Sequence, residues 1–188
     1  MVVETMPYFG LFKQLRELNL PNTADYDLYQ GYYAQFYEAV TVRTDYDIPI
    51  YLEQAKQTGG PVLDLACGSG RVLMHLANAG YPVTGVDLSA DMLQLCRRKL
   101  QQLPPRIKEN VSLVQSDMTE FELGGTFGLI VLSATSITLL DDLGKVERLF
   151  RTVHRHLSLG GRFVFDLSNP QEHAHQTLRD GKASTFLR

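Results

Sequence analysis

The sequence lacks the features that would export the chain or carry it into a membrane. Its 188 residues include only two cysteines, Cys67 and Cys96, and these do not form a Cys-X-X-Cys pair. No stretch approaches about 18 uninterrupted apolar residues. The first residues lack the basic start, apolar run and small-residue cleavage site of a secretory signal. These absences predict a soluble, cytoplasmic protein with no membrane partner.

An excess of charge of either sign is also missing. The chain has 21 acidic and 18 basic residues, a net charge of −3, and no long run of one sign that could follow a phosphate backbone. A nucleic-acid partner is therefore not expected. With 44% hydrophobic residues, the chain can bury one sizeable core.

What the sequence does contain is an alternation of short β-branched runs and longer helical patterns. This alternation predicts an α/β fold with a doubly wound, mostly parallel sheet. Strands are expected over residues 61–66, 81–86, 111–116, 128–133 and 162–167, and helices over residues 47–57, 70–78, 90–102 and 141–156. Ser89 is the expected N-cap of the helix over 90–102. Gly160 and Gly161 are expected to end the helix over 141–156 and to form the turn into the last strand.

The chain divides into two parts by composition. Residues 1–46 are rich in tyrosine and are interpreted as a cap over the site, with a helix near residues 9–18 and a mobile polar stretch over residues 21–33. Residues 47–188 are interpreted as the α/β core.

A glycine turn follows the first expected strand, where open parallel sheets bind their ligands. It reads Asp64-Leu65-Ala66-Cys67-Gly68-Ser69-Gly70. Gly68 and Gly70 would let the backbone approach a ligand closely, and the next helix would present unpaired N–H groups to it. An alternative role for Asp64 is to cap backbone amides at the strand end.

Two further acids end the next two strands. Asp87 follows the second strand and could accept both hydroxyls of a ribose. Asp117 follows the third strand, where its carboxylate and a backbone N–H could hold an adenine edge. Acids at three successive strand ends indicate a nucleoside-containing ligand.

The stretch from Val62 to Leu167 resembles the class I S-adenosylmethionine-dependent methyltransferases. The resemblance rests on the segments VLDLACGSG, VDLS, QSDM and GGRFVF, which occur in that order. It implies that the glycine turn wraps the methionine part of S-adenosylmethionine, that Asp87 binds ribose and that Asp117 lies near adenine. The cofactor-binding positions expected from these segments are Asp64, Ala66, Gly68, Gly70, Asp87, Leu88, Asp117 and Met118. Ser133, at the end of the fourth expected strand, is a further expected cofactor-binding position.

The amino-terminal part carries a looser resemblance. Tyr37-Glu38 and Asp45-Tyr46 are similar to the tyrosine segments that small-molecule N-methyltransferases, such as those acting on amino sugars, place over the cofactor. Tyr46 is therefore expected at the cofactor. Tyr37 and His173 are the candidate catalytic residues, since either could orient an acceptor and receive its proton. The expected acceptor is a small molecule, most simply an amine, although oxygen and carbon remain open.

Other interpretations were weighed against this one. A dinucleotide-binding oxidoreductase would have a third glycine where this sequence has Leu73, and Asp64 would repel a pyrophosphate. Cys67 is interpreted as a packing residue. His154 and His156 are interpreted as solvated residues of a surface helix. No metal site is expected.

The resemblance also implies two antiparallel strands that the sequence does not supply after residue 167. The last expected strand would then be an apolar edge, which a second copy or a partner could cover. A second hypothesis follows, in which the chain binds the cofactor without catalysing transfer.

Overall fold

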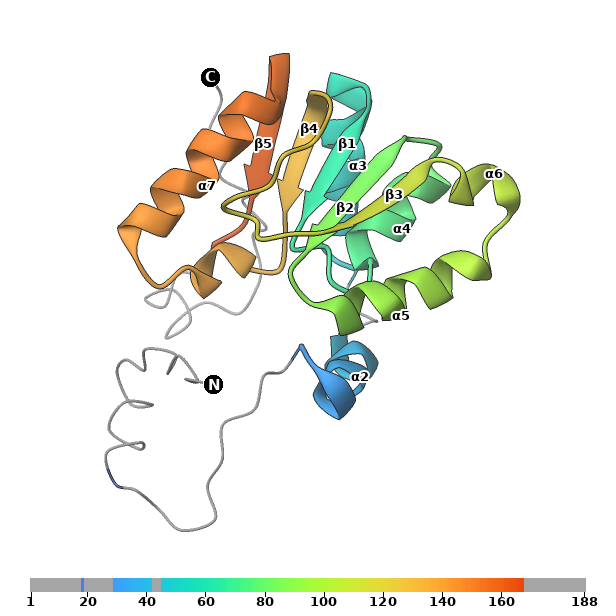
Figure 1. Cartoon of the computed structure of the whole chain (residues 1–188). Helices are drawn as coiled ribbons and strands as arrows, with labels where there is room; N and C mark the ends of the chain where they lie inside the picture. Colours follow the sequence, from blue (N-terminus) through green and yellow to red (C-terminus); the bar gives the residue numbers. More distant parts are fainter. Residues whose placement is uncertain (1–17, 19–28, 42–44, 168–188) are drawn as a thin grey trace.

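The computed structural model describes residue 18, residues 29–41 and residues 45–167 (Figure 1). Five strands form one sheet in the order β3-β2-β1-β4-β5, and every neighbouring pair is parallel. The doubly wound α/β prediction is therefore confirmed. The strands are β1 (Val62–Leu65), β2 (Val83–Asp87), β3 (Val111–Gln115), β4 (Phe127–Leu132) and β5 (Leu157–Phe165). The helices are α2 (Gly31–Thr41), α3 (Ile48–Thr58), α4 (Arg71–Asn78), α5 (Ala90–Gln101), α6 (Pro105–Lys108), the 3-10 helix η1 (Ser136–Leu139) and α7 (Leu143–His156).

Helices cover both faces of the sheet (Figure 1). Val62 packs with side chains of α3, α4 and α5, while Leu63 and Leu65 pack on the opposite face with Leu149 and Val153 of α7. This division follows from the alternation of side chains along a strand. The strand order reverses between β1 and β4, which are buried along their whole length, and a ligand site is expected at this reversal.

Two of the helices begin at side-chain caps. Ser89 accepts the Met92 N–H at 3.2 Å, as the sequence predicts for α5. Asp142 accepts the Lys145 N–H at 2.8 Å, so α7 begins two residues later than the expected start at residue 141.

The prediction that Gly160 and Gly161 end α7 and form the turn into the last strand is wrong. Helix α7 ends at His156, its C-cap is Leu157, and β5 begins at that same residue. Phe127 pairs with Leu157 but Leu129 pairs with Arg162, so residues 158–161 form an irregularity within the strand. A Cβ on Gly161 would lie 2.9 Å from the Ser158 carbonyl oxygen, so this glycine permits the close approach of two backbone segments.

Residues 31–33, expected in a mobile polar stretch, begin helix α2. Tertiary contacts hold this helix beside α5: the Gly31 N–H donates to Asp91 at 2.8 Å, and the Ser89 hydroxyl donates to the Tyr29 carbonyl. The helix expected near residues 9–18 lies outside the described residues, apart from Leu18.

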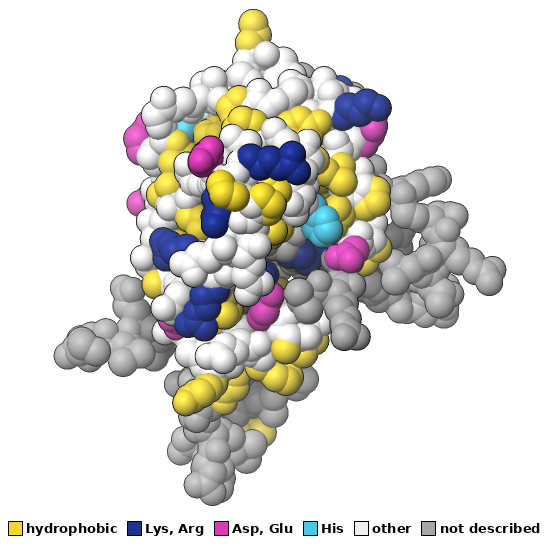
Figure 2. All heavy atoms as spheres, turned by 90° about the vertical axis from the view of Figure 1, so that its right-hand side faces the viewer, with side chains coloured by type: hydrophobic (Ala, Val, Ile, Leu, Met, Phe, Trp, Pro, Cys, Tyr) yellow, Lys and Arg dark blue, Asp and Glu magenta, His cyan; other side chains and the backbone are white. Residues whose placement is uncertain are grey.

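The face of the molecule that includes α5 and α6 carries basic and acidic side chains mixed with hydrophobic ones (Figure 2). Hydrophobic side chains also gather over α2 in this view, and three residues of α2 are strongly exposed: Tyr32, Phe36 and Val40. Within residues 18, 29–41 and 45–167, no helix has the length and apolar character that crossing a membrane requires.

Candidate functional site

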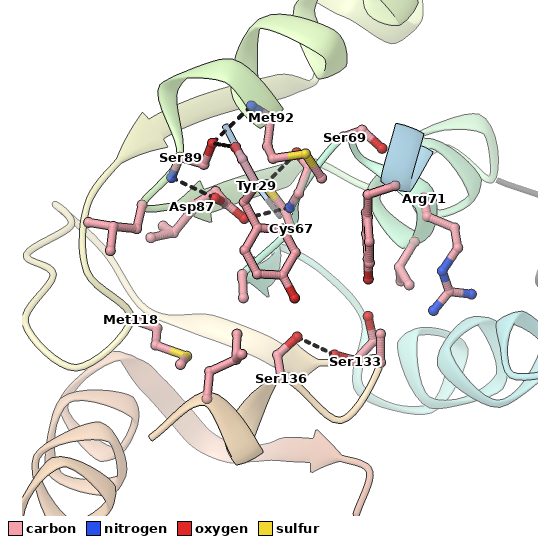
Figure 3. Close-up of a pocket in the computed structure, with 18 of the residues that line it drawn as sticks. Tyr29, Cys67, Ser69, Arg71, Asp87, Ser89, Met92, Met118, Ser133 and Ser136 are labelled. Carbon is pink, nitrogen blue, oxygen red and sulfur yellow. Dashed lines mark hydrogen bonds between the residues drawn. The ribbon is translucent and has the colours of Figure 1, made fainter. Parts of the chain in front are cut away.

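A cavity of about 440 Å³ opens at the carboxyl ends of β1, β2, β3 and β4 (Figure 3). The glycine turn after β1 forms one part of its lining, and the residues that follow β2, β3 and β4 form three more. Residues of α2 and its flanks, Met92 of α5 and Lys145 of α7 also line it. The volume lies within the range of about 300 to 1,000 Å³ that is usual for small-molecule sites.

Most of the residues expected from the sequence meet in this cavity. Those that line it are Tyr37, Tyr46, Ala66, Gly68, Asp87, Leu88, Asp117, Met118 and Ser133. Asp64 and Gly70 do not line it. His173 lies outside the described residues.

The two glycines of the turn have different surroundings, since Gly68 faces the cavity and Gly70 packs against side chains of the protein. Gly68 lines the cavity with φ of 55°, and its N–H donates to Asp87. Gly70 has φ of 86°, and a Cβ there would lie 2.6 Å from the Cys96 sulfur. Gly70 therefore serves helix packing, and its expected place in the ligand site is not observed.

Cys67 directly precedes Gly68 in the turn and is buried. Burial raises the pKa of its thiol well above the ordinary value, an effect that Asp64 and Asp87 reinforce. Such a thiol stays protonated and makes a poor nucleophile, which agrees with its interpretation as a packing residue.

The carboxylate of Asp87 joins the ends of two strands. One oxygen accepts the Gly68 N–H at 2.7 Å and the other accepts the Ser89 N–H at 2.8 Å (Figure 3). Asp87 also lines the cavity, so the same side chain that fixes the turn faces the space where a ligand would bind.

Asp117 is held in a similar way at the end of β3. One of its oxygens, Oδ1, accepts both the N–H and the hydroxyl of Thr119, at 2.7 and 2.8 Å. The carboxylate is exposed at the cavity rim, next to Met118. Its other oxygen is available to an amino group that enters the cavity.

Asp64 lies in β1 behind the glycine turn and is 1% exposed. Among the described residues, neither of its oxygens meets a donor at full hydrogen-bonding geometry, and the role of amide cap stays a prediction. Burial raises the pKa of this carboxyl from its ordinary value of 3.8 to about 7, against the lowering influence of the Arg71 guanidinium and the Leu73 N–H. A buried carboxylate without a partner is costly and points to a use outside folding.

Arg71 is a cavity residue that the sequence analysis missed. Its guanidinium lines the cavity and forms two hydrogen bonds with the buried Asp47 of 2.6 and 2.7 Å. Tyr51 of α3 is buried close to this pair, and burial raises the pKa of its hydroxyl. No sequence motif identifies Arg71, because its partner Asp47 lies far away in the sequence, directly before α3.

The aromatic lining comes from α2 and its flanks. The Tyr29 and Tyr37 rings meet edge to face with centroids 5.2 Å apart, and Tyr29 reaches into the cavity (Figure 3). Tyr46 lines the cavity although it is 79% exposed. Glu38 connects α2 to the core, since it accepts hydrogen bonds from the Ser69 hydroxyl and from Lys99.

His156 is not solvated, in contrast to the expectation. It is 2% exposed, its Nε2 accepts the Leu123 N–H at 3.1 Å, and its Nδ1 lies 2.8 Å from the Thr152 carbonyl. A neutral imidazole with the proton on Nδ1 satisfies both contacts. His156 therefore ties α7 to the segment before β4, whereas His154 is exposed as expected.

Comparison with known families matches residues 62–161 to a methyltransferase domain. YqeM of Bacillus subtilis (strain 168) is 32% identical over 142 residues, which cover 74% of this chain and 55% of that protein. The dTDP-3-amino-3,6-dideoxy-alpha-D-glucopyranose N,N-dimethyltransferase of Streptomyces fradiae is 28% identical over 145 residues, or 73% of this chain and 54% of that protein. The chain thus spans about half the length of the curated relatives it matches.

A solved structure of the glycopeptide N-methyltransferase MtfA, complexed with (S)-adenosyl-L-methionine, shares the fold. It has 35% sequence identity and a TM-score of 0.61, over 69% of this chain and 57% of that one. The family match covers more than half of the 188 residues and includes the glycine turn and the acids that follow β2 and β3. The chain therefore belongs to the methyltransferase domain family, within the class I S-adenosylmethionine-dependent methyltransferases.

Proposed function

We propose that this chain binds S-adenosylmethionine in the cavity and transfers its methyl group to a small-molecule amine. The observation that carries the proposal is the position of Asp87. Its carboxylate lines the cavity at the end of β2 and anchors the glycine turn through the Gly68 N–H. One side chain thereby links the part of the site that would hold a ribose to the part that would hold the methionine group.

The residues of the cavity suit such a ligand from end to end. Asp87 would accept the ribose hydroxyls. Asp117 and the neighbouring Met118 backbone would hold the adenine edge, with Leu88 against the ring. Asp64 does not line the cavity, but when ionised its carboxylate behind the turn would attract the ammonium of the methionine group.

When bound, S-adenosylmethionine supplies an electrophilic methyl group on a positively charged sulfur. The residues around it have to align an acceptor in line with that methyl and exclude water. Tyr29 and Tyr37 of the α2 region suit both tasks, because their rings cover the cavity and can stabilise a cation. We infer that Tyr37 orients the amine and that His173 is a second candidate for receiving its proton.

An amine acceptor is supported by two lines of reasoning. The Streptomyces fradiae relative is named for an amino sugar and MtfA for N-methylation of a glycopeptide. The cavity wall after β4 supplies small side chains, Ser133, Ala134 and Ser136, which leave room for an acceptor beside the turn. The amine must arrive neutral, since only its lone pair can attack the methyl group.

A second candidate function is cofactor binding without turnover. Both functions require the same contacts to S-adenosylmethionine, so only an assay of the product separates them.

The test is a calorimetric titration of the purified chain with S-adenosylmethionine, S-adenosylhomocysteine and NAD. Binding of the first two alone supports the proposal, and binding of NAD alone overturns it. Formation of S-adenosylhomocysteine is then measured with dTDP-3-amino-3,6-dideoxy-α-D-glucopyranose as the amino-sugar probe and with a panel of simple amines. Binding without product across that panel favours the second candidate.

A further inference from the structure

The loop after β4 is held in an unusual backbone conformation. Ala134 and Thr135 have φ of 57° and 55°, two consecutive left-handed residues that are not glycine. L-residues rarely adopt this conformation, and strain of this kind persists only where surrounding contacts enforce it. The loop forms a wall of the cavity through Ser133, Ala134 and Ser136.

One side chain outside the loop is hydrogen-bonded to its backbone at this point. The Thr135 N–H donates to Oδ2 of Asp166 at 2.7 Å, the length of a charge-assisted hydrogen bond. Asp166 directly follows β5, whose last residue, Phe165, pairs with Leu132 at the end of β4. The parallel register therefore brings Asp166 beside the start of the loop.

Contacts within the loop do not replace this bond. The Ser136 N–H and hydroxyl both return to the Ser133 carbonyl, at 3.2 and 2.7 Å. Thr138 donates to the Thr135 carbonyl. These bonds close short turns on either side, but the Thr135 N–H itself is satisfied by Asp166.

Asp166 does not line the cavity, and its contact with the cavity wall is the bond to Thr135. Its second oxygen, Oδ1, is buried and has no hydrogen-bond partner among the residues described by the structure. Burial raises the pKa of this carboxyl, an effect that Asp47 reinforces and the Thr135 N–H opposes. A carboxylate in this costly environment is expected where its bond to the backbone has a use beyond folding.

We propose that Asp166 is a positioning residue for methyl transfer, which fixes the wall formed by Ser133, Ala134 and Ser136 so that the acceptor is held in line with the methyl group. This inference rests on the proposed function. The site then has two parts. Asp87 and the glycine turn hold the cofactor part, and Asp166 holds the acceptor part through Thr135.

The test compares Asp166→Ala with Asp166→Asn in the 188-residue chain. Asparagine retains an oxygen that can accept the Thr135 N–H, whereas alanine leaves that N–H without its acceptor. In Asp166→Ala, hydrogen exchange of the segment 133–140 should accelerate, and Asp166→Asn should restore it towards the wild-type rate. Adding Thr135→Gly to Asp166→Ala should also recover function, because glycine adopts the left-handed conformation without strain.

Kinetics with the amino-sugar probe distinguish positioning from loss of stability. Asp166→Ala should lower kcat/KM for the acceptor by about 100-fold, the effect expected when a reacting group moves by about 1 Å. Its affinity for S-adenosylmethionine, measured by calorimetry, should stay within about twofold of wild type. The control is Glu147→Gln, which alters an exposed ion pair on α7 and should leave both constants unchanged.

Unchanged exchange of the segment 133–140 in Asp166→Ala would overturn the inference, whichever acceptor the protein uses. Equal losses of cofactor affinity and acceptor turnover would also overturn it, because they indicate general damage. Failure of wild type to bind S-adenosylmethionine would instead contradict the proposed function, and the exchange experiment would still decide whether Asp166 holds the loop.

Discussion

The buried carboxyl of Asp64 predicts an unusual dependence of stability on pH. It is 1% exposed, it has no hydrogen-bond partner among the described residues, and burial raises its pKa from 3.8 to about 7. Replacing it by asparagine keeps the shape and removes the titration. We expect Asp64→Asn to be more stable than wild type at neutral and alkaline pH, although it removes a group of the proposed site.

The sign follows from proton binding in the two states. Between about pH 4 and pH 7 the folded protein holds a proton on Asp64 that the unfolded chain has lost, so the free energy of unfolding falls as the pH rises through this window. The pKa difference of about three units, at 1.36 kcal/mol each, corresponds to about 4 kcal/mol. The stability difference between Asp64→Asn and wild type should therefore grow from near zero at pH 4 to about 4 kcal/mol above pH 7.

The assay is urea denaturation of both proteins at about pH 4, 6 and 8 without cofactor. Taking the difference between the two proteins removes the contribution of every other titrating group. The control is Glu147→Gln. Because Arg151 lowers the pKa of this exposed carboxyl, the variant should lose a little stability relative to wild type, and that loss should shrink as the pH falls towards 4, the opposite trend to Asp64→Asn. A pH-independent difference for Asp64→Asn would refute the reasoning, because it would mean that the carboxyl stays ionised when buried.

Three further outcomes are expected. Asp87→Ala should weaken binding of S-adenosylmethionine by at least about 100-fold in calorimetry, since two hydrogen bonds to a charged group would be lost; affinity within the error of the Glu147→Gln control would contradict the placement of the ribose. His156→Ala should lower the free energy of unfolding by about 3 kcal/mol in urea denaturation, because it leaves a backbone N–H unsatisfied and opens a void; a loss below about 1 kcal/mol would show that the contact is replaced by water. Gly70→Ala should cost about 2 kcal/mol or more, and Cys96→Ala in the same chain should recover part of that loss, because it removes the sulfur 2.6 Å from the new Cβ; no recovery would assign the cost to the backbone alone.

The sheet could be predicted because each strand carries its own signal. Five β-branched runs bounded by turn residues gave all five strands, and Ser89 marked the start of α5 correctly. The errors occurred where a partner far away in sequence decides the local structure. Pairing with Phe127 extends β5 back to Leu157, so Gly160 lies within a strand and not in a helix cap.

The residues of the site also fall into those that local sequence predicts and those that distant contacts decide. Asp87 and Asp117 could be assigned to the cavity because the ends of neighbouring parallel strands meet at one edge of the sheet. Gly70 belongs to the same motif as Gly68, yet it packs against Cys96 of α5. Arg71 and its bond to Asp47 had no local signal, since their contact depends on the packing of α3 against α4.

The sequence by itself determined the order of strands and helices, the parallel sheet and the edge at which its polar groups gather. These properties depend on alternation, turn residues and strand ends, which are local in the chain. The tertiary structure decided which side chains are buried and what holds the loops. It placed Asp64 without a partner, His156 in the interior and Asp166 beside Thr135, because burial and hydrogen bonding depend on segments that approach one another only after folding.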